Sequence, residues 1–268
     1  MSNKKLSDFK ALLFDIDRTL TDTKRNISTE TLEALHELRK KGFLTGVCSG
    51  RGTPNLINKI LPLFPENSLH ITTGGSRLIN SKGEVLWEKS IETDTIKNLR
   101  EYINKNKMLA VFFKNDALYS MDPILTQLKK DTWDVIAKNL NEMSNDGVGA
   151  VYIPKPNNEA LSYIENANLS YKKMNDNFGN PYIDITPKGI NKSTTLKKWS
   201  KYTGVPPEKI IGFGDSLNDM EFLQACGFKV AMGNSVAEIK EIADRVIGHI
   251  DNNSLAKYLI KIIRGGDL

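Results

Sequence analysis

The chain has 268 residues, of which 40% are hydrophobic and 26% are charged, the usual composition of a soluble globular protein. The length predicts a full-sized core domain with a smaller companion. Its 37 basic and 32 acidic residues are intermixed, so the net charge of +5 suits an anionic ligand but does not indicate a nucleic-acid partner. No apolar run reaches the roughly 18 residues of a membrane span, and residues 1–10 do not form a signal sequence. We therefore expect a cytoplasmic protein without a membrane partner, with Cys48 and Cys226 as buried thiols.

The first chemical motif follows the apolar residues 10–14, which predict a short buried strand. This strand delivers Asp15-Ile16-Asp17-Arg18-Thr19-Leu20, with two carboxylates two positions apart. A helix is then expected from Ser28 or Thr29, with leucines at helical spacing until Gly42 ends it.

The second motif, Ser49-Gly50-Arg51, again stands after a predicted strand, at residues 43–48. A third short apolar run at 69–71 leads into Gly74-Gly75-Ser76, and residues 77–80 and 84–87 then predict a hairpin. Three loops with small or polar residues thus follow predicted strands.

Between residues 91 and 182 the composition of the sequence changes. Asparagine-rich loops such as Asn157-Asn158 separate strand candidates at 109–113 and 148–153. We interpret this stretch as an inserted second domain.

The remaining chain returns to alternating strands and helices. Gly189-Ile190-Asn191-Lys192 precedes a predicted helix at 193–202, and a strand at 209–213 leads into Gly214-Asp215-Ser216-Leu217-Asn218-Asp219. Further helices are expected at 217–225 and 236–243, with strands at 229–232 and 245–247. This alternation predicts a parallel, doubly wound sheet whose ligands bind beyond the carboxyl ends of its strands.

Taken singly, each motif could be an ordinary turn or a solvated surface. Taken in order, the four resemble the sequence motifs of the haloacid dehalogenase superfamily, and their details look most like its Cof-type branch (subfamily IIB). The resemblance implies an α/β fold: a Rossmann-like, doubly wound core from residues 1–88 and 184–268, with an inserted α/β (C2-type) cap at 89–183. It also implies a phosphatase that acts on small phosphorylated metabolites.

The resemblance assigns the chemistry residue by residue. Asp15 would be the nucleophile that forms an aspartyl phosphate, and Asp17 the general acid and base. Crowding by other carboxylates is expected to keep Asp17 protonated at the start. The cofactor would be Mg²⁺, because repulsion between a carboxylate and a dianionic phosphate must be neutralised. Its ligands would come from Asp15, the backbone carbonyl of Asp17, Asp215 and Asp219. Phosphate contacts are expected from Thr19, Ser49, Gly50, Lys192 and Asn218.

Two departures from the family pattern stand out. Arg18 replaces a usual glycine, and we expect it to be exposed to solvent. Gly74-Gly75-Ser76 replaces the usual Asn-Gly-Ala, which puts in doubt any substrate contact made by that asparagine. Two alternatives stay open: a phosphomutase or phosphotransferase of the phosphomannomutase type, and a noncatalytic protein that binds a phosphorylated ligand.

Overall fold

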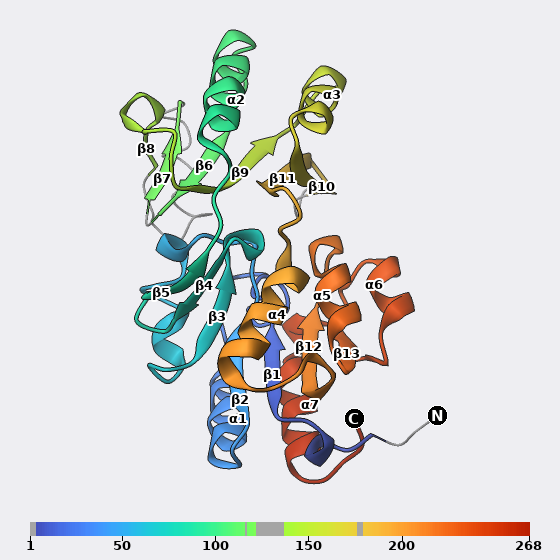
Figure 1. Ribbon diagram of the computed structural model, residues 1–268. Coiled ribbons are helices and arrows are strands. Elements are labelled where there is room, and N and C mark those ends of the chain that lie inside the picture. The colour runs from blue at the N-terminus through green and yellow to red at the C-terminus, as the bar shows by residue number, and fades with distance from the viewer. Residues whose placement is uncertain (1–3, 116, 122–136, 176–178) are drawn as a thin grey trace.

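The computed structural model describes residues 4–115, 117–121, 137–175 and 179–268. Figure 1 shows an α/β core in the lower half of the view, with a second sheet and two helices above it. The predicted fold class, a Rossmann-like parallel core with an added cap region, is confirmed.

The core sheet has five parallel strands in the order β14-β13-β12-β1-β2. They are β1 (Ala11–Phe14), β2 (Leu44–Val47), β12 (Ile210–Gly214), β13 (Phe228–Ala231) and β14 (Arg245–Val246). A parallel bridge between Cys48 and Ile71 joins β2 to an antiparallel sheet made of β3 (Leu69–Thr72), β4 (Arg77–Asn80) and β5 (Val85–Glu88). The loops after β1, β2, β3 and β12 therefore meet at one edge.

Helices cover both faces of the core sheet because β1 is apolar on both sides. Leu12 and Phe14 pack with α1 (Thr29–Lys40) and α7 (Ser254–Ile263). Ala11 and Leu13 pack on the opposite side with α4 (Lys192–Thr203), α5 (Met220–Ala225) and α6 (Ala237–Ile242). Ser28 is the N-cap residue of α1, as predicted, since its side chain accepts a hydrogen bond from the Thr31 N–H at 3.1 Å.

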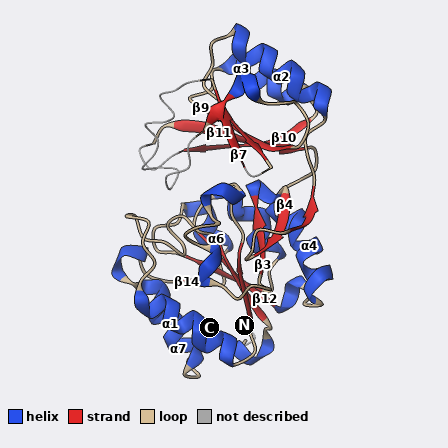
Figure 2. Cartoon of the chain, turned by 90° about the vertical axis from the view of Figure 1, so that its left-hand side faces the viewer, coloured by secondary structure: helices blue, strands red, loops and turns tan. Residues whose placement is uncertain are grey.

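The cap region comprises the second sheet and two helices. Its strand order is β10-β11-β9-β6-β7-β8, antiparallel except for the pair β7 and β8. The strands are β6 (Val111–Lys114), β7 (Ala117–Ser120), β8 (Lys138–Asn139), β9 (Val148–Pro154), β10 (Leu169–Asn175) and β11 (Pro181–Pro187). Figure 2 shows this sheet between the core and the helices α2 (Thr93–Lys105) and α3 (Asn158–Asn166).

The cap region has its own hydrophobic core, whose buried members run from Ile91 to Ile185. The predicted domain boundary between residues 183 and 184 falls inside β11. Among the helices of the described residues, none has the length and apolar character needed to cross a bilayer. Cys48 and Cys226 are buried free thiols, as predicted.

Candidate active site

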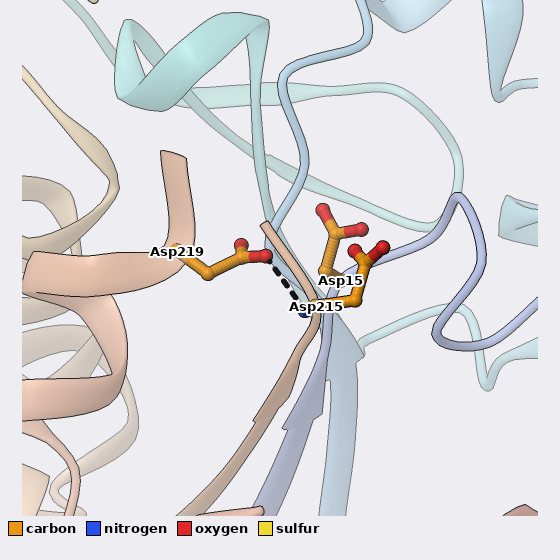
Figure 3. Close-up of side chains that lie close together, drawn as sticks. All are labelled: Asp15, Asp215 and Asp219. Atoms are coloured by element: carbon orange, nitrogen blue, oxygen red, sulfur yellow. Dashed lines mark hydrogen bonds between the residues drawn. The ribbon is translucent and has the colours of Figure 1, made fainter. Parts of the chain in front are cut away.

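Three aspartates meet where β1 and β12 end, and Figure 3 shows their side chains converging. Asp15 directly follows β1, Asp215 directly follows β12, and Asp219 ends the short 3-10 turn η8 (Leu217–Asp219). One carboxylate oxygen from each lies within 4.8 Å of the others. All three residues are at most 5% exposed. The carboxyl ends of neighbouring parallel strands thus bring together groups that are about 200 positions apart in the chain.

Asp219 holds this arrangement together with both of its oxygens. Its Oδ2 accepts hydrogen bonds from the backbone N–H groups of Asp215 at 3.1 Å and Ser216 at 3.2 Å. Its Oδ1 accepts one from the Lys192 ammonium at 2.6 Å. The carboxylate therefore fixes the loop that carries Asp215, in addition to contributing negative charge.

Lys192 places the positive charge of the site at the start of α4. Its Nζ lies 2.7 Å from Asp15 Oδ1 and 3.5 Å from Asn218 Oδ1. Burial acts to lower its pKa, but the carboxylates of Asp15 and Asp219 hold that pKa well above the usual range. Asn191 caps the helix, since its side chain accepts from the Thr194 N–H at 2.9 Å. The neighbouring carboxylates therefore stabilise the charged ammonium, and the Asn191 N-cap fixes the backbone of the helix start.

Gly75 packs closely against the backbone at the start of the same helix. Its φ of 104° favours glycine, and a Cβ there would lie 2.3 Å from the carbonyl carbon and oxygen of Asn191. The Thr195 hydroxyl also donates to the Gly75 carbonyl oxygen. Gly75, which stands at the position where the family pattern also has glycine, thus allows close packing against the segment that presents Lys192.

The electrostatics of the acidic cluster call for a further cation. Burial and the neighbouring Asp219 raise the pKa of Asp15 to about 7, against the opposing effect of Lys192. Burial and the carboxylate of Asp15 raise the pKa of Asp215 well above its usual value. Three buried carboxylates facing one ammonium would carry a net charge of −2 if fully ionised, which one divalent cation balances. Their hard oxygen donors fit Mg²⁺.

The second motif lies beside this cluster. Ser49 is buried, and its hydroxyl accepts a hydrogen bond from the Arg51 N–H at 3.1 Å. A Cβ on Gly50 would lie 3.7 Å from Asn218 Nδ2, so the second and fourth motifs face each other across Gly50. Thr19 is also buried, and its hydroxyl lies 3.4 Å from Asp215 Oδ1, on the side of the acidic cluster.

Asp17 has a partner that the sequence interpretation did not foresee. Its two carboxylate oxygens each lie 2.6 Å from a nitrogen of the Arg51 guanidinium, Nε and Nη2. Asp17 is therefore not one of the three clustered carboxylates but forms a bidentate ion pair with Arg51. The Asp17 side chain is 39% exposed. The prediction that Arg18 is exposed is wrong: Arg18 is partly buried, with φ of 61° and its carbonyl bound by the Asn234 side chain.

A cavity of about 290 Å³ opens beside these motifs, between the core and the cap region. Its core wall includes Gly50, Lys192 and Asn218. The cap wall is formed by residues from β10 and β11, whose sequences carry no recognisable motif. The cap residues that line it are Leu169, Ser170, Tyr171, Lys172, Asp184 and Thr186.

Comparisons with known proteins agree with this geometry. A sequence profile of the family described as haloacid dehalogenase-like hydrolase matches residues 12–259. The chain is 27% identical, over 92% of its length and 95% of the relative, to the 5-amino-6-(5-phospho-D-ribitylamino)uracil phosphatase YitU of Bacillus subtilis (strain 168). Among solved structures, it is similar to a haloacid dehalogenase-like hydrolase from Bacteroides thetaiotaomicron, with a TM-score of 0.80, 20% identity and coverage of 95% and 99% of the two chains. The subclass IIB sugar phosphatase BT4131 gives a TM-score of 0.79, 23% identity and coverage of 94% and 98%.

Proposed function

We infer the function of this chain from the family to which it belongs: it is a haloacid dehalogenase-like hydrolase of the Cof-type branch, and a phosphatase. From this premise we propose that it hydrolyses small phosphate monoesters in a Mg²⁺-dependent reaction, through an aspartyl phosphate on Asp15. The observation that carries the proposal is the buried convergence of Asp15, Asp215 and Asp219 beside the Lys192 ammonium. A sugar phosphate or a similar polyol phosphate is the substrate class that we propose, in line with the relatives' names.

The metal site would use the acidic cluster. Asp15, Asp215 and the backbone carbonyl of Asp17 would hold Mg²⁺, and Asp219 would support them through the loop that it fixes. The ion would supply charge neutralisation for the phosphoryl oxygens. Ser49, Gly50, Lys192 and Asn218 would hold the phosphate, with Thr19 nearby on the metal side.

The reaction needs two steps. An oxygen of Asp15 attacks phosphorus, the bond between phosphorus and the leaving oxygen breaks, and Asp17 gives its proton to that oxygen. Asp17 then takes a proton from water, whose oxygen attacks the aspartyl phosphate; inorganic phosphate leaves and the Asp15 carboxylate is restored. In the structure both carboxylate oxygens of Asp17 accept hydrogen bonds from the Arg51 guanidinium. For the first step, Asp17 must leave Arg51 and carry a proton.

The cap region would supply substrate selectivity, because the core motifs contact only the phosphate end of a ligand. We assign residues 89–183 to it, with the β11 segment as its return to the core. Movement of this region over the cavity would admit substrate and then exclude water.

A phosphate-release assay with p-nitrophenyl phosphate and a panel of sugar and polyol phosphates tests the function. Activity should require Mg²⁺, disappear with chelator, and fall below about a hundredth of the wild-type rate in Asp15→Asn, since an amide cannot form the covalent intermediate. Asp94→Asn, on the exposed first turn of α2, is the matched control and should behave as wild type. Phosphate release that persists in Asp15→Asn would contradict the nucleophile assignment. Isomerisation of a sugar monophosphate that needs a sugar bisphosphate and releases no inorganic phosphate would instead indicate a mutase.

A further inference from the structure

The cavity wall carries a carboxylate that the proposed chemistry does not use. Asp184 lies in β11 and lines the cavity, and a Cβ built on Gly50 would be 3.9 Å from its Oδ2. Within the described residues, the Asp184 carboxylate forms no hydrogen bond or ion pair. Burial raises its pKa to about 6, against the opposing charges of Lys192 and Lys172, so it is mostly ionised at neutral pH. A partly buried, ionised acceptor without a donor is an unusual group in a folded protein.

The other charged groups around the cavity already have partners. Lys192 is bound to Asp15 and Asp219 of the acidic cluster. Lys172 forms an ion pair with Glu221 and also donates to the Leu217 carbonyl oxygen at 3.2 Å. Since the charges of Lys172 and Glu221 cancel, the described residues that line the cavity beyond its phosphate end keep one negative charge, that of Asp184.

We propose that Asp184 selects the leaving group of the substrate: it accepts a hydrogen bond from a hydroxyl or ammonium group near the phosphoester and disfavours a leaving group that carries a second anion. This inference rests on the proposed phosphatase function. A donor would satisfy the carboxylate with a charge-assisted hydrogen bond, whereas a second carboxylate or phosphate would meet a like charge in a place with little water. The cavity has the volume of roughly ten water molecules, enough for a short polyol chain.

Three esters with the same six-carbon backbone test the proposal with the full-length, Mg²⁺-supplied protein. Sorbitol 6-phosphate presents neutral hydroxyls, 6-phosphogluconate replaces the terminal hydroxymethyl group by a carboxylate, and n-hexyl phosphate has neither. The wild type should prefer sorbitol 6-phosphate to 6-phosphogluconate by at least about tenfold in kcat/KM, and Asp184→Asn should shrink that ratio by about tenfold. Hydrolysis of n-hexyl phosphate should stay within about twofold, which also shows that the variant folds.

Asp146→Asn is the matched control, because Asp146 is a cap carboxylate paired with Lys114 and does not line the cavity. Its ratio between the two polyol esters should equal that of the wild type. Asp184→Ala gives a second variant and should also lose the preference. A wild type without preference, or Asp184 variants that keep the wild-type ratio, overturns this inference alone. A wild type that releases phosphate from none of the esters overturns the proposed function and the inference with it.

Discussion

The Arg51 guanidinium donates a hydrogen bond to each carboxylate oxygen of Asp17, and both nitrogen-to-oxygen distances are 2.6 Å. The pair joins the loop after β2 to the loop after β1, and it fixes the direction in which Asp17 points. Bidentate pairs of this kind add geometric specificity as well as attraction.

Replacing Arg51 by alanine should lower kcat by between about tenfold and a hundredfold, because Asp17 would no longer be directed when it acts as the base in the second step. Steady-state kinetics on p-nitrophenyl phosphate give the measurement. Arg51→Lys keeps the charge but offers a single nitrogen, so it should restore only part of the loss. Full recovery in Arg51→Lys would show that charge alone matters.

Metal binding should be visible without any assay of turnover. Adding Mg²⁺ to chelator-treated protein should raise the melting temperature, since a ligand bound only by the folded state stabilises it. In Asp215→Ala that rise should be smallest and the Mg²⁺ concentration for half-maximal activity highest. Asp244→Asn, a carboxylate paired with Lys229 away from the cluster, is the control. An Asp215→Ala protein with an unchanged metal titration would remove Asp215 from the ligand set.

Gly75→Ala should lower the free energy of unfolding by about 1–3 kcal/mol and also reduce kcat. The added methyl group would strike the Asn191 backbone, so the segment that carries Lys192 must shift. Gly204→Ala provides the comparison, because Gly204 has a similar positive φ of 72° but open space around it. Urea unfolding and steady-state kinetics are measured on both variants. Gly204→Ala reports the cost of a positive φ alone, and Gly75→Ala reports that cost plus the clash of the methyl group with the Asn191 backbone. Equal losses of stability and unchanged kcat in both would contradict this packing role.

His70 should make the protein less stable in mild acid. Burial lowers the pKa of His70 to about 3, from the ordinary 6.5, and its Nδ1 accepts a hydrogen bond from the Val47 N–H at 3.2 Å. Below about pH 6.5 the unfolded chain takes up a proton that the folded chain refuses, so this residue lowers the free energy of unfolding by about 1.4 kcal/mol per pH unit.

The measurement is urea unfolding of the wild type and His70→Gln between about pH 6 and pH 4.5. The difference between their stabilities should change with pH by that slope, in favour of the variant as the pH falls. Parallel curves would show that His70 does not titrate differently in the folded and unfolded states.

Sequence patterns predict the core well, because each core strand is a short apolar run with a polar motif at its end. The runs before Asp15 and Ser49 and the run before Asp215 correspond to β1, β2 and β12 with boundaries shifted by one residue or so. The expected helix from Leu217 instead begins as the 3-10 turn η8, with α5 starting at Met220, because Asp219 turns back to bind the backbone of its own loop.

The contacts between motifs are not encoded in any local pattern. Asp17 and Arg51 are 34 positions apart, and spacing alone does not tell which side chains of two strand-end loops will pair. Asp184 stands among alternating residues of β11, where its direction depends on the register with β9 and β10. The need for glycine at position 75 comes from its close approach to the Asn191 backbone, a tertiary contact that the local sequence does not reveal.

One continuous piece of chain links β11 to Lys192. The Ser170 hydroxyl accepts from the Gly189 N–H at 2.9 Å, and the Thr186 hydroxyl donates to the Ile190 carbonyl at 2.7 Å, so the connecting loop is tied to β10 and β11. The cap sheet is therefore tied to the loop that leads directly into Lys192. The cap movement proposed above would therefore be coupled to the position of the segment that presents Lys192, and not to the cavity wall alone.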